Sequence, residues 1–163
     1  MAIYRDEYAR ARQLRACYLV THVGSHRGQG EALGIARVAE AINRTLQYAP
    51  DDGPLIVLEN TAGSGQGLGY TFEQLAAIRA AAARAALVGF CLDTAHLFAA
   101  GHPIHTEAGL AQVTSAFDRI VGKPLLKVIH LNDSKVPFDS RVDRHWHIGE
   151  GQIGLEAFRR IVN

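Results

Sequence analysis

Residues 87–96 read Leu-Val-Gly-Phe-Cys-Leu-Asp-Thr-Ala-His. Its first part is a short apolar run, typical of a strand that is buried on both faces of a sheet. Its last part places an aspartate and a histidine, two metal-ligand types, at the end of that strand. Three other apolar runs also end in polar residues of this kind, and we expect strands at 17–22, 55–59, 87–93 and 125–131.

Helical patterns separate the four predicted strands. Residues 30–48 place apolar side chains three and four residues apart, and Thr71-Phe-Glu-Gln74 is a capping box that predicts a helix start. The predicted helices cover residues 4–15, 30–48, 71–86, 106–121 and 155–161. Because helices and strands alternate without a hairpin signal, the sequence predicts an α/β fold with a parallel sheet, as one domain over residues 1–163.

The composition is that of an ordinary globular domain. The chain has 163 residues, of which 48% are hydrophobic and 20% charged, and it contains no apolar run long enough to span a membrane. We therefore expect a cytoplasmic protein without a membrane partner. A formal net charge of +1 gives no global argument for binding nucleic acid. Cys17 and Cys91 lie in apolar runs and are expected to be buried free thiols.

Polar residues of metal-ligand type follow the predicted strands. The carboxyl ends of parallel strands meet at one edge of a sheet or barrel, so these side chains should converge. Carboxylates and imidazoles without thiolates suit zinc, manganese or iron in a hydrolytic site, and more than one ion would suit phosphoester hydrolysis. The alternative is a set of unrelated polar residues that cap strand ends. The candidate ligands are His22, Glu59, Asp93, His96, His130, Asp143 and His145.

The glycine-rich loop at residues 63–69 raises the question of a nucleotide cofactor. It reads Gly-Ser-Gly-Gln-Gly-Leu-Gly and satisfies the dinucleotide pattern Gly-x-Gly-x-x-Gly in no frame. Glu59 and Asn60 also stand where a pyrophosphate needs an uncharged approach. We therefore expect no nucleotide cofactor, and a loop whose backbone amides could face the phosphates of a polymer.

Four long motifs follow one another along the chain. They are Leu58-Glu-Asn-Thr-Ala-Gly63, Cys91-Leu-Asp-Thr-Ala-His-Leu-Phe-Ala-Ala-Gly101, His130-Leu-Asn-Asp-Ser-Lys135, and Arg141-Val-Asp-Arg-His145 with Ile148-Gly-Glu-Gly-Gln-Ile-Gly154. Together these motifs resemble the endonuclease IV family. The resemblance implies a (β/α)₈ TIM barrel of the xylose-isomerase-like kind and a three-zinc centre. It also implies a DNA repair hydrolase that cuts double-stranded DNA 5′ to an abasic site during base excision repair.

The resemblance also implies a role for each candidate ligand. His22 would bind one zinc, and Glu59 would act in catalysis by bridging that ion to a second, which Asp93 and His130 also hold. The third zinc would take His96, Asp143 and His145, and manganese could replace zinc. Water activated by the metal would attack the phosphorus. The residues expected to contact the DNA backbone are Asn60, Ser134, Lys135, Arg141 and Arg144.

The resemblance covers only part of the family barrel. A complete barrel needs roughly 250 residues, and the four predicted strands correspond to strands four through seven. A histidine ligand of the first zinc and a glutamate ligand of the second therefore have no counterpart, whereas the third set is complete. We expect a partial barrel that belongs to an active enzyme and has little activity alone. Two alternatives remain, a metal-dependent sugar isomerase or epimerase of related barrels and a non-catalytic DNA-binding derivative.

Overall fold

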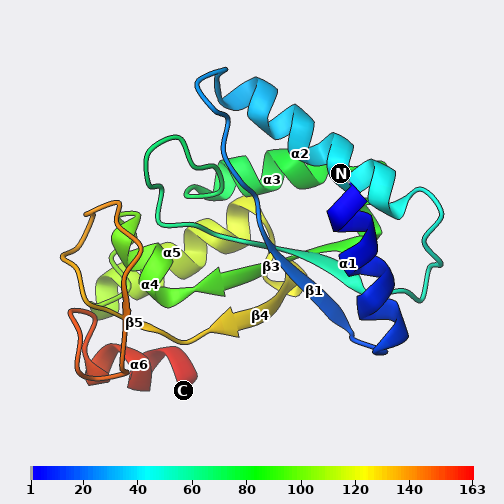
Figure 1. The fold of residues 1–163 in the computed structure, drawn as a ribbon. Helices are drawn as coiled ribbons and strands as arrows, with labels where there is room; N and C mark the ends of the chain where they lie inside the picture. Colours follow the sequence, from blue (N-terminus) through cyan, green and yellow to red (C-terminus); the bar gives the residue numbers. More distant parts are fainter. Residues whose placement is uncertain (1) are drawn as a thin grey trace.

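A parallel four-stranded sheet forms the centre of the protein. The computed structural model describes residues 2–163. All strands of the main sheet run parallel and follow one another in chain order, as Figure 1 shows. They are β1 (Tyr18–His22), β2 (Leu55–Glu59), β3 (Val88–Asp93) and β4 (Leu126–His130). This order confirms the predicted partial barrel of four βα units, because each strand pairs with the next one along the chain.

The register of the sheet brings the strand ends together. His22 lies opposite Glu59 in the β1–β2 pair, and Asp93 lies opposite His130 in the β3–β4 pair. Each of these residues is the last of its strand. Four candidate ligands therefore occupy the same edge of the sheet before any loop is considered.

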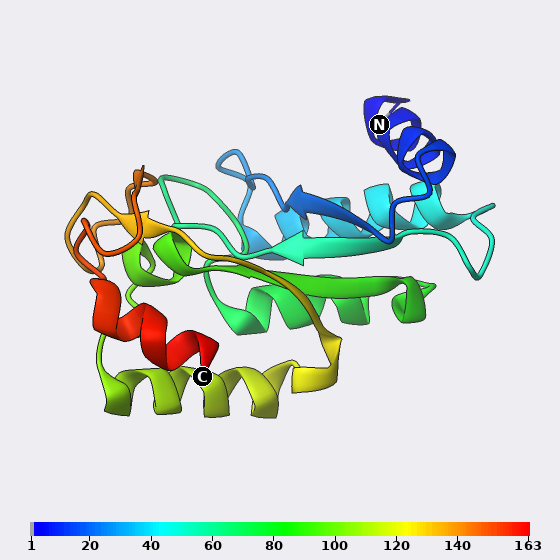
Figure 2. The same cartoon turned by 90° about the horizontal axis from the view of Figure 1, so that it is seen from below.

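The helices pack against one another in the order of the chain. α1 contacts α2, α2 contacts α3, α3 contacts α5, and α5 contacts α6. Figure 2 shows α3 and α5 along one face of the sheet. The ring of Phe90 on β3 meets that of Phe117 on α5 edge to face. Among residues 2–163, no helix is both long and apolar enough to cross a membrane. The α-helices are α1 (Ala2–Gln13), α2 (Glu31–Leu46), α3 (Phe72–Ala80), α4 (Thr94–Ala99), α5 (Glu107–Ile120) and α6 (Leu155–Val162).

Two expectations about burial are wrong at the edges of the sheet. β2 and β3 are buried almost throughout, but β1 and β4 are partly exposed because each has a neighbouring strand on one side only. Cys17, just before β1, is exposed for the same reason, whereas Cys91 in β3 is buried as expected.

The third predicted helix is shorter than expected. α3 ends at Ala80, and a short 3₁₀ turn (Ala85–Leu87) leads into β3. The side chain of Asn43 on α2 donates to the carbonyl of Ala81 and accepts from the amide of Ala83. These bonds satisfy backbone groups that a continuing helix would have used.

Four further elements were not expected from the sequence. α4 starts directly after β3, because the Asp93 carboxylate accepts from the backbone amide of His96 and caps the helix. Two short strands, β5 (Asp133–Ser134) and β6 (His145–Trp146), form an antiparallel ribbon after β4. A second 3₁₀ turn (Lys123–Leu125) precedes β4.

Candidate metal centre

Glu59 lies among three imidazoles at the carboxyl edge of the sheet. Its Oε2 is 3.3 Å from His22 Nε2, and its Oε1 is 3.1 Å from His130 Nδ1. The same Oε1 is 3.5 Å from Nδ1 of His96. Glu59 is buried while His22 is exposed, so the carboxylate is held at the base of the site with both oxygens facing ring nitrogens. This arrangement allows one carboxylate to serve two neighbouring ions.

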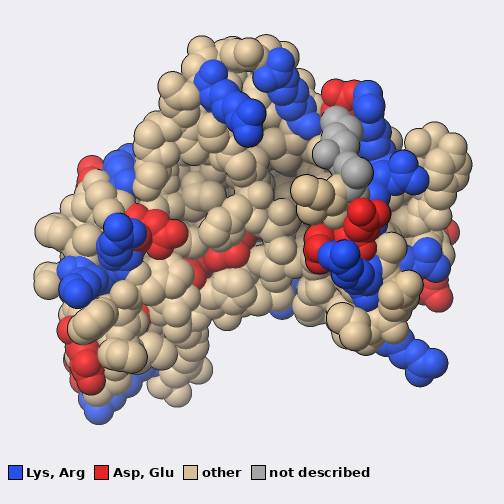
Figure 3. All heavy atoms as spheres, in the orientation of Figure 1, with Lys and Arg blue, Asp and Glu red and all other residues tan. Residues whose placement is uncertain are grey.

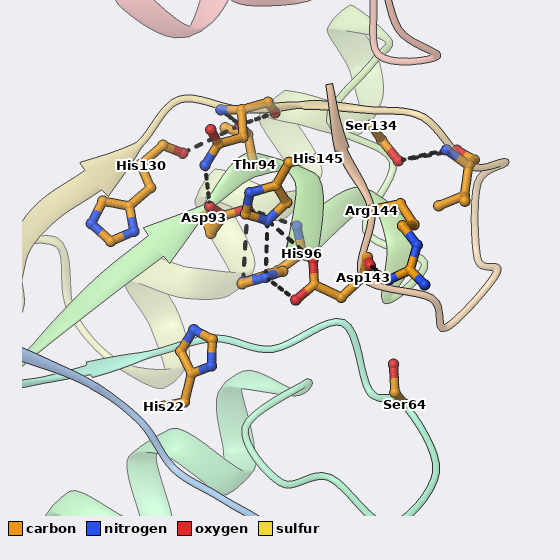
Figure 4. Close-up of polar contacts among 12 residues, drawn as sticks. His22, Ser64, Asp93, Thr94, His96, His130, Ser134, Asp143, Arg144 and His145 are labelled. Atoms are coloured by element: carbon orange, nitrogen blue, oxygen red, sulfur yellow. Dashed lines mark hydrogen bonds and ion pairs between the residues drawn. The ribbon is translucent and has the colours of Figure 1, made fainter. Parts of the chain in front are cut away.

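A second group of ligands joins α4 to the ribbon. Nε2 of His96 is 3.1 Å from Asp143 Oδ2 and 3.2 Å from His145 Nε2, and His145 Nε2 is 3.1 Å from Asp143 Oδ1. Tetrahedral ligands at about 2.0–2.2 Å from zinc lie roughly 3.3–3.6 Å apart, which is close to these spacings. Figure 4 shows the three side chains pointing toward one another, His96 from α4 and the other two from the segment that leads into β6. We name His96, Asp143 and His145 the distal set.

Asp93 lies beside the distal set. Its Oδ1 is 3.8 Å from His145 Nε2 and 3.7 Å from His96 Nδ1, and its Oδ2 accepts a 2.6 Å hydrogen bond from Asn132. The resemblance to endonuclease IV implied that Asp93 binds the same ion as Glu59 and His130, and this assignment stays a prediction. The capping of α4 and the bond from Asn132 turn the carboxylate toward His96 in this structure.

Cys91 also lies near the centre. The thiol comes within 4.8 Å of ligand atoms of Glu59 and His130. Burial raises the pKa of this thiol to about 12, which opposes the thiolate form that binds metals. The apolar run around Cys91 predicted only a buried free thiol outside the site.

The hydrogen bonds of His96 orient its ring. Nδ1 lies 2.9 Å from the carbonyl oxygen of Asn60, which can only accept, so Nδ1 carries a proton and Nε2 is the nitrogen left to bind a metal ion with Asp143 and His145. The Asn60 side chain is buried and holds the backbone of Asp93 through both its oxygen and its nitrogen. Asn60 thus fixes the ends of β2 and β3 relative to each other.

The charges of the site favour a cation. Burial alone lowers the pKa of His96, but the hydrogen bond to Glu59 and the charges of Asp93 and Asp143 raise it to about 9. Burial alone raises the pKa of Glu59, yet the imidazoles of His96, His130 and His22 hold it below its usual value. Surroundings that retain a proton on His96 also stabilise a metal ion that takes the place of that proton.

The residues expected to contact DNA fall into a buried group and an exposed group. Asn60 and Ser134 are buried, and their side chains bond to backbone groups within the chain, so neither is free to contact DNA. Lys135, Arg141 and Arg144 are exposed. Lys135 Nζ lies 4.3 Å from the centre of the Trp146 ring, and the Arg141 guanidinium lies 4.9 Å from that of Tyr70.

The fold family follows from comparison with known proteins. A family model described as "Xylose isomerase-like TIM barrel" matches residues 1–163. The chain belongs to this family. It is 47% identical over 163 residues to "Probable endonuclease 4" of Geobacter sulfurreducens, covering all of this chain and 55% of the relative. A protein of the same name from Chloroflexus aurantiacus is 48% identical, with 57% of its length covered.

The fold of this TIM-barrel chain also matches that of a solved structure. The crystal structure of endonuclease IV from Thermus thermophilus matches with a TM-score of 0.82 and 36% identity, over 96% of this chain and 54% of that one. The chain therefore spans a little over half the length of these relatives. The resemblance inferred from the sequence motifs is confirmed as a similarity to proteins of that name.

Proposed function

We propose that this chain is part of a zinc-dependent endonuclease that hydrolyses the phosphodiester 5′ to an abasic site in double-stranded DNA. The observation that carries the proposal is the distal set, in which each of the three side-chain pairs among His96, Asp143 and His145 comes within 3.2 Å. The distal set lies beside the Glu59 group, which is Glu59 with the imidazoles of His22 and His130. The names of the relatives, similar over the whole of this chain, support the substrate class.

The residues of the chain fit a zinc site of this kind. The distal set and the Glu59 group offer imidazole nitrogens and carboxylate oxygens, which are ligands that zinc accepts in catalytic sites. When bound, zinc supplies Lewis acidity toward a phosphodiester and a source of nucleophilic water near neutral pH. Glu59 would join two ligand groups through its two oxygens, and Asn60 would keep His96 in the binding tautomer.

The surface around the site suits a polyanion. Figure 3 shows carboxylates on the floor of a hollow, with Lys and Arg side chains at its margins. Lys135, Arg141 and Arg144 are exposed on the segment that also carries Asp143 and His145. Cationic side chains there would bind backbone phosphates and position the strand without reading its sequence.

Incision of damaged DNA tests the proposed function. With zinc, the 163-residue chain is expected to cut an end-labelled duplex 5′ to a single abasic site, leaving a 3′ hydroxyl, and EDTA should stop the reaction. We expect the reaction to be slow, because four strands surround the ligands on one side only. A folded, zinc-loaded chain that cuts no faster than its His96→Ala variant would contradict the proposal, as would equal cutting of undamaged duplex.

A further inference from the structure

The glycine-rich segment after β6 converges on one buried carboxylate. Oδ1 of Asp133 accepts from the backbone amides of Ser134 at 2.7 Å and Ile153 at 2.9 Å. Oδ2 accepts from the amides of Gly149, Gly151 and Gly154 at 3.0, 3.1 and 3.3 Å. Asp133 is fully buried, so its charge is balanced by these amide dipoles rather than by water. We name this group of contacts the Asp133 clamp.

The glycines of the segment are required by the clamp. A Cβ on Gly151 would lie 2.4 Å from Asp133 Oδ1 and 2.5 Å from the carbonyl oxygen of Ser134. Gly149 and Gly154 have φ values of 85° and 81°, which side chains other than glycine rarely adopt. The pattern Gly149-Glu-Gly-Gln-Ile-Gly154 therefore describes a loop built to surround one carboxylate.

The Asp133 clamp is linked directly to the metal ligands. Asp133 and Ser134 form β5, in which Ser134 pairs with His145 and Asp133 pairs with Trp146. The amide of Lys135 also donates to the carbonyl of Arg144 at 2.9 Å. A ribbon of two residues per strand has little stability by itself. The clamp holds the chain from Gly149, four residues after His145, and so fixes the end at which the chain leaves the ribbon.

We propose that Asp133 is a positioning residue that holds Asp143 and His145 in place to bind metal with His96. This inference rests on the metal-binding role of the distal set in the proposed function. Asp133 itself touches no metal ligand side chain; it acts through the backbone of β5, β6 and residues 149–154. A purely structural role in starting α6, which begins at Leu155, would leave metal affinity unchanged once the chain is folded.

Zinc titration of an Asp133→Asn variant tests this proposal. Asparagine keeps the shape of the side chain but replaces one acceptor oxygen with an NH₂ group that faces amide donors. We expect the tightest zinc affinity to fall roughly 10–100-fold, the usual cost of losing a supporting contact around metal ligands, with the far-UV circular dichroism retained. The visible spectrum of cobalt(II) bound in place of zinc should change in parallel. Asp118→Asn is the matched control, since it removes an exposed carboxylate that accepts one backbone amide from Lys123.

A second variant breaks the clamp without changing its charge. Gly151→Ala places a methyl group against Asp133 Oδ1 and should lower the same zinc affinity. Wild-type zinc affinity in both folded variants would overturn the proposal, and so would loss of fold in both, because either result would make the clamp purely structural. A wild-type chain that binds no zinc would overturn the proposed function as well, whereas intact zinc binding in both variants overturns only the role of Asp133.

Discussion

Replacing His96 with alanine is expected to lower the zinc affinity of the distal set by more than about 100-fold. The side chain is nearly fully buried and contacts both Glu59 and the other members of the distal set, so its loss removes a ligand that exposed neighbours cannot replace. Loss of a supporting contact costs roughly 10–100-fold, and loss of a direct ligand should cost more. Competition with a zinc chelator of known affinity measures the effect.

The matched control for this substitution is His147→Ala. His147 is exposed and belongs to none of the ligand groups found among the described residues, although it follows closely after His145. We expect its zinc affinity to match that of the wild type. Equal zinc affinity in the His96→Ala variant and the wild type would show that the distal set does not bind the ion.

Replacing Phe90 with alanine is expected to lower the free energy of unfolding by about 3–5 kcal/mol, the usual cost of deleting a buried aromatic ring. Phe90 is fully buried at the centre of the sheet and packs edge to face on Phe117 of α5. The ring therefore joins the sheet to the helix layer. Urea denaturation followed by circular dichroism measures the change.

Tyr48→Ala serves as the control for the stability measurement. Its side chain is 80% exposed, so we expect a change within about 0.5 kcal/mol. If Phe90→Ala were as stable as Tyr48→Ala, the packing of α5 against β3 described above would be wrong.

The main sheet could be predicted from the sequence because its strands carry local signals. Each strand is a short apolar run that ends in a polar residue, and amphipathic or capped segments lie between them. Thr71 and Thr106 cap α3 and α5 as their sequence context indicates. The missed elements depend on contacts that the local pattern does not contain. α4 depends on the Asp93 cap, and the end of α3 depends on Asn43, which lies 38 residues before Ala81 in the chain.

The ligand types could be predicted for the same reason, and the resemblance implied that His96, Asp143 and His145 form one set, but the position of Asp93 and the burial of Asn60 could not be predicted. The register of parallel strands brings His22 beside Glu59, and the sequence suffices to expect this convergence. The position of Asp93 depends on Asn132, and the burial of Asn60 depends on bonds to the backbone of Asp93. The motif His130-Leu-Asn-Asp-Ser-Lys135 contained both Asn132 and Asp133, but nothing local showed that the carboxylate binds amides up to 21 residues away.

The distal set is the most complete of the ligand groups. In the distal set each of the three side-chain pairs comes within 3.2 Å, and Asp143 uses a different oxygen toward each imidazole. The Glu59 group is more open, because the His22 side chain is 57% exposed, more than Asp143 at 48% or His145 at 42%, and its ring meets Glu59 at 3.3 Å. An ion in the distal set should therefore dissociate more slowly than one held by His22 and Glu59.

Elemental analysis of the 163-residue chain, loaded with zinc and then dialysed against metal-free buffer, tests whether the distal set is the tight metal site. We predict one zinc ion retained per chain, lost in the His96→Ala variant. Retention of three ions per chain, or of none, would contradict the assignment of the distal set as the tight metal site.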